Sequence, residues 1–457
     1  MIVKIKNFGP IFHATIEVKP LTLIIGKNNL GKSYLAQLLH TICTTLVPPV
    51  PFEFGFRAPF MLTFSPPTLE KEIVAPIKSK SAEGALDHAS KIIVEKYRKW
   101  LEESLREELE TSFGMPVQKL ISVGSSSAEI TVSSVEILID DDGQVKVKWL
   151  NEGEIITHIK REIANQVERI RIARRGDDRL NSAFTLLHAV EGKMRELILG
   201  KEMSKGRSIY IPAGRAGLLE SFRTVHSALL SLSPLAFTRD IRVPGLPSLA
   251  ARFYIILSNL GRKKGFMSQI AEDFKNILGG DILLRREEKT PFLLSMEYLS
   301  KYHGKEFPMD IIHAASMIKE LAPLYLITRE IIKAGDFVTI EEPESHLHPG
   351  AQLELIKILA KLVNKNVYVL ATTHSDFLLR KVALLVGQRL IKKDDPTSLD
   401  VQSVAIYLLK DTDRGSVLEK IAIPEDGILE ELPTFDEVIR ELYEGESSLQ
   451  STQLEKR

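Results

Sequence analysis

The sequence predicts an α/β fold with a mixed sheet, an antiparallel β subdomain and a helical hairpin insert. Short apolar runs alternate with helical periodicity in the C-terminal half, a pattern typical of a buried parallel sheet. Residues 116–150 switch to a period of two, which indicates antiparallel strands. Residues 152–200 show two runs of helical periodicity, which indicates a short pair of antiparallel helices.

The composition of the chain favours a folded protein with more than one part. Its 457 residues exceed the usual size of one compact domain. Hydrophobic residues make up 44% and charged residues 26%, which allows a sizeable core and excludes wholesale disorder. Lys+Arg and Asp+Glu both number 60, so the chain is not a uniformly basic protein that coats nucleic acid.

Cysteine usage and hydropathy favour a cytoplasmic protein. The only cysteine, Cys43, excludes a disulfide framework and a cysteine-based zinc site. The chain opens with MIVKIK, which lacks the layout of a signal peptide. No apolar run approaches the roughly 18 residues that span a bilayer. We therefore expect a cytoplasmic location and no membrane partner.

Four segments follow from the patterns along the chain. In residues 1–47, two alternating strands and the apolar run LTLII precede a helix that starts near Lys32. Residues 48–205 form an insert: an irregular stretch rich in Pro and Phe, a helix, a β-hairpin and the helical hairpin. Residues 206–400 return to strands and helices, and residues 401–457 add a β-hairpin and an acidic helix.

Two of these segments allow finer predictions. In the insert, the strands EITVSSVEILI and QVKVKWL flank Asp140 to Gly143, a hairpin turn of the Asp-Gly type. In the third segment the strands RSIYIP (207–212), FVTI (337–340) and VYVLAT (367–372) alternate with helices over about 214–278, 311–334 and 350–363, and from Ser375.

The most informative motif is GKNNLGKS at residues 26–33, which matches GxxxxGK[ST] between an apolar strand and an amphipathic helix. Glycines let backbone N–H groups curl round phosphate oxygens, and the helix N-terminus adds partial positive charge. Lys32 would reach the β- and γ-phosphates of ATP, and the Ser33 hydroxyl would coordinate Mg²⁺. The motif therefore predicts a nucleotide site with ATP and Mg²⁺.

A second motif supplies the acids that such a site needs. The apolar strand FVTI ends in Glu341 and Glu342, which are followed by Pro343. Glu341 is placed to hold the Mg²⁺ shell, and Glu342 is placed to orient or deprotonate the attacking water. The alternative is a strand that ends in solvated acids before a proline.

Taken together, GKNNLGKS, EEPESHLHP and TTHSDFLL (372–379) resemble, in that order, the ABC-type P-loop ATPase heads of the RecF, SMC and OLD (overcoming-lysogenization-defect) group. The opening KNFGPI (6–11) resembles the strand and loop that lie beside the nucleotide in these heads. The motifs span almost the whole chain, and residues 48–205 correspond to an insert that varies within the group. The resemblance implies an ABC-type head that hydrolyses ATP as a homodimer.

The resemblance also implies roles for individual residues. Glu342 becomes the catalytic base, His374 the histidine that contacts the γ-phosphate, and Lys32 the lysine that acts with them. Ser33 and Glu341 become the Mg²⁺ ligands. The nucleotide would be contacted by Asn7, Phe8, Gly26, Lys27, Asn28, Asn29, Leu30, Gly31, Lys32, Ser33, Tyr34 and Ser316.

Two departures from ABC heads stand out. The stretch that corresponds to their Leu-Ser-Gly-Gly-Gln signature keeps Ser316, but Met317 and Ile318 replace the glycines. Ser316 is either a helix-N-terminal donor to a γ-phosphate across a dimer or a mid-helix residue. The usual glutamine after RSIYIP is also missing, and the turn Pro212-Ala-Gly-Arg215 resembles one in OLD-like ATPases. Arg215 is either a site or signalling residue or a surface turn arginine.

A Toprim nuclease, which often follows the ATPase in OLD-like proteins, is not expected here. The acids near the C-terminus, Asp411 and Asp413, form a couple typical of a hairpin turn, whereas a Toprim site needs several carboxylates. His346 and His348 form an H-x-H without a further ligand set, so we expect no metal there. The resemblance places them in a loop that crosses a dimer interface.

Three functions remain open from the sequence. The leading hypothesis is the ATP-switched regulatory subunit of an OLD-like system, such as an antiviral defence, with a separately encoded effector, either a nuclease or a toxin. The alternative is a RecF- or SMC-like DNA maintenance or repair ATPase that binds nucleic acid through Arg171, Arg174 and Arg175, although these residues also suit a solvated helix face. The third is an ATP-binding scaffold without turnover.

Overall fold

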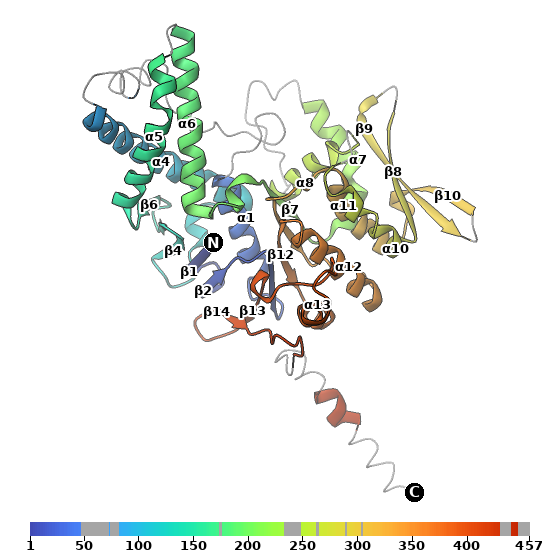
Figure 1. The fold of residues 1–457 in the computed structure, drawn as a ribbon. Coiled ribbons are helices and arrows are strands. Elements are labelled where there is room, and N and C mark those ends of the chain that lie inside the picture. Colours follow the sequence, from blue (N-terminus) through green and yellow to red (C-terminus); the bar gives the residue numbers. More distant parts are fainter. Residues whose placement is uncertain are drawn as a thin grey trace, which may run out of the picture.

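A computed structural model describes residues 1–46, 73, 82–172, 176–232, 248–261, 265–287, 290–302, 305–429 and 440–446. The described chain is built around an eleven-stranded sheet (Figure 1). The strands lie in the order β6 (Val145–Trp149), β5 (Val135–Asp140), β4 (Ser127–Val132), β1 (Ile2–Phe8), β2 (Ile11–Glu17), β14 (Ser416–Ile421), β13 (Val404–Lys410), β3 (Leu21–Gly26), β12 (Tyr368–Thr373), β11 (Phe337–Glu341) and β7 (Ser208–Ile211).

The sheet has a parallel half and an antiparallel half. Strands β13, β3, β12, β11 and β7 run parallel to one another. The strands from β6 to β2 pair antiparallel, and β14 joins the two halves because it is antiparallel to β13 and parallel to β2. The predicted α/β fold with a mixed sheet is therefore confirmed.

Helices cover both faces of the parallel half because its strands are apolar on both sides. In β3, Ile24 packs into one hydrophobic cluster, while Leu23 and Ile25 pack into the other. The first cluster also contains residues of α1 (Lys32–Leu46), α4 (Ala82–Phe113), α5 (Glu152–Ile172) and α6 (Gly176–Leu199). The second draws on α7 (Arg215–Leu232), α8 (Ser248–Ser258), α9 (Ser268–Ala271), α10 (Phe274–Leu278), α11 (Ser316–Glu330), α12 (Pro349–Val363) and α13 (Asp376–Ile391).

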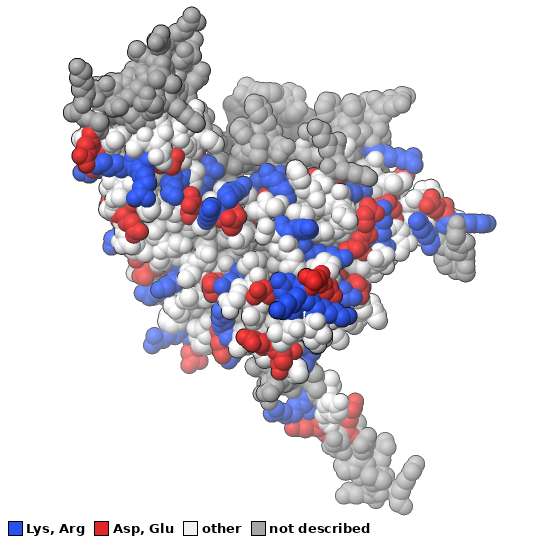
Figure 2. Space-filling model, in the orientation of Figure 1, with Lys and Arg blue, Asp and Glu red and all other residues white. Residues whose placement is uncertain are grey.

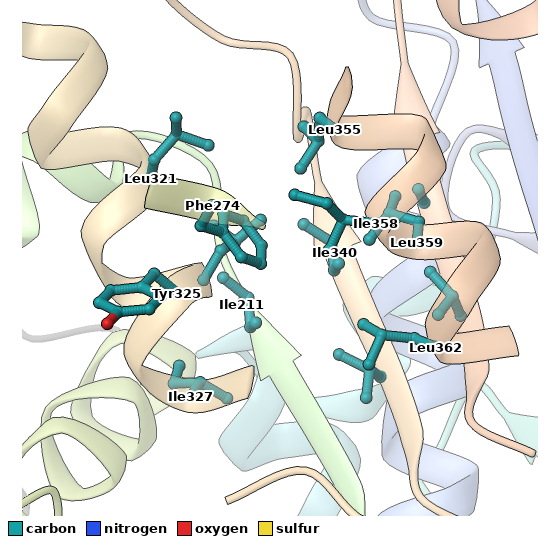
Figure 3. Packing of buried hydrophobic residues seen from close by; sticks show 14 of the residues in the cluster. Ile211, Phe274, Leu321, Tyr325, Ile327, Ile340, Leu355, Ile358, Leu359 and Leu362 are labelled. Carbon is teal, nitrogen blue, oxygen red and sulfur yellow. The ribbon is translucent and has the colours of Figure 1, made fainter. Parts of the chain in front are cut away.

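The second cluster fixes the strands that carry the site. Figure 3 shows Ile340 of β11 and Ile211 of β7 between two helices, with Leu359 of α12 on one side and Leu321 of α11 on the other. Burial of each such side chain stabilises the fold by roughly 1.5–3 kcal/mol. The ends of β11 and β7 are therefore held by rigid packing.

Two features project from this body. Helices α5 and α6 pack together as the predicted helical hairpin (Figure 1). A separate antiparallel sheet of β8 (Gly280–Glu287), β9 (Thr290–Tyr302) and β10 (Lys305–Asp310) lies beyond α7 and α11. Short 3₁₀ turns at Val117–Leu120, Met203–Lys205, Ile311–His313 and Val401–Ser403 connect the larger elements.

The antiparallel region differs from the prediction in one respect. The stretch EITVSSVEILI is two strands, β4 and β5, and not one, because the chain turns at Ser133 and Ser134. Ser133 has φ 49°, a left-handed conformation that glycine or asparagine usually marks in a sequence. The predicted turn from Asp140 to Gly143 is present, and the Gly143 N–H donates to the Asp140 carbonyl.

The C-terminal hairpin belongs to the main sheet, since β13 and β14 lie between β3 and β2.

The four segment boundaries drawn from the sequence remain a prediction. Within the described ranges no helix is long and apolar enough to cross a membrane.

Candidate functional site

Four neighbouring parallel strands end at one level and bring the predicted motifs together. The loop GKNNLGKS follows β3, His374 follows β12, Glu342 follows β11 and the turn that ends at Arg215 follows β7. The register pairs Ile25 with Thr373, Glu341 with Thr372, and Ile340 with Ile211. The carboxyl edge of a parallel sheet is where ligands bind in open α/β folds.

The phosphate loop depends on its two glycines. Gly31 has φ 94°, and a Cβ there would lie 2.5 Å from the Pro10 Cγ. Gly26 has φ 152°, and a Cβ there would lie 2.9 Å from the Leu409 carbonyl oxygen. Only glycine therefore lets this loop curl against its neighbours. Residues 27–29 at its tip are exposed, as is Ser33 in the first turn of α1.

Lys32 folds over the loop that precedes it. Its Nζ donates to the Gly26 carbonyl at 2.9 Å and to the Lys27 carbonyl at 2.8 Å. Burial lowers the pKa of the Lys32 ammonium, while the negative charges of Glu342 and Glu344 raise it. The lysine is thus placed between the loop and the acids after β11.

Glu341 presents a buried carboxylate oxygen that suits a cation. Its Oε2 accepts from the Ala213 N–H at 3.2 Å. Its Oε1 is buried and has no hydrogen-bond partner among the described residues. Burial, and next the charge of Glu341, raise the pKa of Tyr210 well above its usual value. An unpaired buried carboxylate oxygen beside the loop fits a Mg²⁺ ligand, and the Ser33 hydroxyl fits the same hard cation.

Glu342 sits in a strained backbone conformation. Its φ is 44°, in the left-handed region that costs a non-glycine residue roughly 1–2 kcal/mol. Its N–H donates to the Thr372 carbonyl at 2.9 Å, and its carboxylate accepts from the Ser345 hydroxyl at 3.1 Å. The His374 Nε2 lies 3.8 Å from the Glu342 Oε1. Strain of this kind clusters at functional sites.

Glu344 is a further residue of this group that the sequence analysis missed. Its buried carboxylate accepts from the Thr373 hydroxyl and from the His374 N–H, both at 2.7 Å. Burial raises the pKa of Glu344, and its hydrogen bonds lower it. Burial, and then the charge of Lys32, lower the pKa of His374, which favours a neutral imidazole. The sequence offered one signal for Glu344, since it is the third acid in the motif EEPE (341–344).

Arg215 is fully buried and does not lie on the surface. Its guanidinium donates to the carbonyls of Pro212 (2.9 Å), Glu320 (3.1 Å), Glu341 (2.6 Å) and Glu342 (2.9 Å), and it pairs with the Glu320 carboxylate at 3.0 Å. The interpretation of Arg215 as a surface turn arginine is wrong. Its contacts are backbone atoms of the site.

Three further residues expected to contact the nucleotide are Asn7, Phe8 and Tyr34. Asn7 has φ 55° and accepts through its carbonyl from the Ser122 N–H. The ring of Phe8 is fully buried, edge-on to Phe113 and Tyr34, so its contribution at this edge is to packing. Tyr34 is partly buried.

Ser316 and the histidine pair occupy exposed positions. Ser316 is the first residue of α11 and is exposed, so it lies at a helix N-terminus and not in mid-helix. His346 is exposed with φ 61°, and His348 caps α12 by accepting from the Gly350 N–H at 3.2 Å. His348 is therefore the N-cap residue of α12.

The remaining residues singled out from the sequence are the arginines of the helical hairpin and two acids near the C-terminus. Arg171 belongs to α5, but its side chain falls outside the described residues, as do Arg174 and Arg175 altogether. Asp411 and Asp413 lie in the exposed turn between β13 and β14.

Comparison with protein families finds one match. Residues 1–54 and 308–379 match the profile of the AAA ATPase domain family. These two ranges contain the phosphate loop, Glu341, Glu342 and His374. The sequence matches no curated protein. These two ranges of the chain are therefore similar to an AAA ATPase domain.

The fold is similar to solved heads of SMC proteins. One is a head bound to the C-terminal winged-helix domain of ScpA, with 12% identity, a TM-score of 0.43, and 93% of this chain and 98% of the other covered. A second, from Pyrococcus furiosus with the C-terminal domain of ScpA, has 12% identity, a TM-score of 0.38 and coverages of 97% and 98%. The head from Thermotoga maritima has 9% identity, a TM-score of 0.36 and coverages of 92% and 98%.

Proposed function

We propose that this protein binds Mg²⁺ and ATP and hydrolyses ATP. The observation that carries the proposal is the alignment of four parallel strand ends, which groups Lys32, Glu341, Glu342 and His374 at one edge. A buried lysine and an unpaired buried carboxylate are unfavourable in a purely structural region. Both become useful when a triphosphate and a divalent cation supply the missing charges.

The residues divide the chemistry between them. Bound Mg²⁺ would neutralise charge on the β- and γ-phosphates. Lys32 would exchange its two loop carbonyls for phosphate oxygens, and the loop N–H groups would orient the nucleotide. Glu342 would take a proton from the water that attacks the γ-phosphorus, as the bond to the ADP oxygen breaks. Neutral His374 would donate a hydrogen bond to the γ-phosphate, with its backbone held by Glu344.

We further propose that ATP brings two copies together. Ser316 stands exposed at the start of α11, where the free N–H groups of a helix favour an anion. A second copy would place this end against the γ-phosphate held by the first copy. Hydrolysis would then separate the pair, so that the protein works as a switch.

The proposed role of the switch is regulation of a separately encoded effector, as in OLD-like systems. The support is the resemblance of GKNNLGKS, EEPESHLHP and TTHSDFLL to the OLD group. On the face drawn in Figure 2, Lys/Arg and Asp/Glu side chains are interspersed over the described residues and do not separate into one continuous basic patch. This distribution gives no preference to a nucleic-acid partner on that face.

Steady-state phosphate release tests the proposal. The wild-type protein should release phosphate from Mg²⁺-ATP. The Glu342→Gln variant should bind ATP but release no phosphate. Absence of release by the wild type, alone and with its natural partners, would refute hydrolysis. Recovery of an associated nuclease or toxin with the native protein supports regulation. Stimulation by duplex DNA that is lost in Arg171→Glu with Arg174→Glu would favour DNA maintenance.

A further inference from the structure

We propose that Arg215 is a positioning residue that orients the two acids after β11 and links them to the start of α11. This inference rests on the proposed ATPase function, because the acids it orients are those assigned to Mg²⁺ and to the water. Arg215 is assigned a positioning and not a catalytic role, because its guanidinium is directed at backbone carbonyls and at the Glu320 carboxylate. Its side chain is fully buried behind the edge of the site.

The first argument is the set of acceptors that Arg215 gathers. Two of them, the carbonyls of Glu341 and Glu342, belong to consecutive peptide units at the end of β11. A guanidinium has five N–H donors in a fixed plane, so it constrains the direction of every carbonyl that it binds. Rotation of either peptide would break a charge-assisted hydrogen bond inside the protein, where it is strong.

The second argument is the strain at Glu342. A φ of 44° persists only if surrounding contacts hold it. The Glu342 carbonyl accepts both from Arg215 and from the Ser345 N–H, while its N–H donates to Thr372. Arg215 supplies the charged member of this set. Without it, the carboxylate of Glu342 would lose its fixed direction relative to the loop.

The third argument is the link to α11. Arg215 pairs with Glu320, which lies about one turn after Ser316 on the same helix. Glu320 Oε1 also accepts from the Ala216 N–H at 3.1 Å, so the first turn of α7 belongs to the same network. A displacement of the start of α11 therefore reaches the carbonyls of Glu341 and Glu342 through one side chain. Contact of a second copy with Ser316 would be transmitted along this path.

The chain contains a matched control at the other end of the same two strands. Arg207 precedes β7 and Asp336 precedes β11, and they form an ion pair at 2.9 Å with Asp336 fully buried. Arg207 also donates to the Ile331 carbonyl. This pair joins the same strands as Arg215 does but lies away from the loop. Its removal reports the consequences of losing a buried ion pair alone.

The experiment compares two double substitutions that remove both charges of each pair. Arg215→Met with Glu320→Met removes the network at the site, and Arg207→Met with Asp336→Leu removes the control pair. Removing both partners leaves no unpaired buried charge, which favours folding of both proteins. Arg215→Lys keeps the charge but not the fork of donors, and it serves if the first variant does not fold. Three quantities are measured for each: ATP binding, the single-turnover rate with Mg²⁺-ATP, and amide hydrogen exchange in the nucleotide-free state.

We expect the single-turnover rate of the Arg215 variants to fall about 100-fold, because small misplacement of a catalytic group has effects of this size. ATP affinity should change by less than about threefold, since the loop itself is untouched. Exchange of the Glu342 and Ser345 amides should accelerate by about tenfold or more as their hydrogen bonds loosen. The control pair should leave the rate, the affinity and these two amides within about threefold of wild type.

Two results would overturn the inference. One is a normal turnover rate with unchanged exchange of residues 341–347 in the Arg215 variants. The other is an equal loss of turnover in both double variants, which would mean that Arg215 acts only through overall stability. If the wild type does not hydrolyse ATP, the proposed function fails, and hydrogen exchange still decides whether Arg215 orients this segment.

Discussion

The two ends of strands β7 and β11 are built from similar residues but in opposite ways. At the amino end, Asp336 is satisfied on both oxygens by Arg207 and the Lys333 N–H, in a closed structural pair. At the carboxyl end, the Arg215 guanidinium donates to backbone carbonyls, including that of Glu341. One carboxylate oxygen of Glu341 has no hydrogen-bond partner among the described residues. A protein interior normally satisfies every buried polar group. The proposed nucleotide site lies at the end that leaves an oxygen of Glu341 without a partner among the described residues.

The largest expected effect tests the carboxyl end. Glu342→Gln should reduce ATP turnover by about 1,000-fold, equivalent to roughly 4 kcal/mol, because an amide cannot take the proton from water. ATP binding and thermal unfolding should remain close to wild type, since the Glu342 side chain is partly exposed. Single-turnover phosphate release, together with calorimetric ATP titration, measures both. Retained turnover would assign the base to another residue.

The next effect tests the amino end. Asp336→Ala should lower the free energy of unfolding by about 3 kcal/mol, because it leaves the Arg207 guanidinium and the Lys333 N–H without their partner. The affinity of the folded protein for ATP should not change. Urea unfolding gives the stability, and ATP titration at a temperature where the variant is folded gives the affinity. A large loss of affinity at unchanged stability would break the contrast between the two ends.

A third effect concerns a histidine behind the amino end of β7. The His40 Nδ1 lies 2.7 Å from the Ser208 hydroxyl, and burial, followed by the charge of Arg252, lowers the pKa of His40 to about 3. The unfolded chain therefore takes up a proton below about pH 6.5 that the folded protein does not take up until about pH 3.

Stability from this histidine is complete above pH 6.5 and falls as the pH is lowered. The loss should reach about 2 kcal/mol between pH 6.5 and about pH 5. His40→Gln, which can still bond Ser208, should remove this part of the acid destabilisation. Denaturant unfolding of both proteins across the pH range measures the difference. Identical pH profiles would show that His40 is protonated or solvated in the folded protein.

The smallest effect has the opposite sign from that of Asp336→Ala. Glu341→Gln should raise the free energy of unfolding of the nucleotide-free protein by about 1 kcal/mol, because it neutralises a buried carboxylate and keeps an acceptor for the Ala213 N–H. The same substitution should weaken the dependence of ATP binding on Mg²⁺. Urea unfolding with a chelator present tests the first part. A destabilised Glu341→Gln would indicate that the second oxygen already has a partner.

The parallel half of the fold and the phosphate loop could be predicted because their signals are local. The run LTLII, the turn at Gly26 and the helix from Lys32 are contiguous, so hydrophobic pattern and glycine chemistry identify them without a neighbour. The turn at Ser133 was missed because nothing in the pattern EITVSSVEILI marks a left-handed residue. A turn of this kind is hard to predict wherever a serine adopts the left-handed conformation that glycine or asparagine usually adopts.

The loop, the acids after β11 and the α/β alternation can be predicted from the amino-acid order alone, since each depends on neighbouring residues. The pairing of Arg215 with Glu320 and the hydrogen bond from the His374 N–H to Glu344 follow only from the packing of the folded chain. Arg215 and the Glu341 carbonyl are 126 positions apart in the chain, and Arg215 and the Glu320 carbonyl are 105 positions apart. A buried guanidinium finds such acceptors only when the sheet and α11 have packed, so hydrophobic burial fixes which distant polar groups meet.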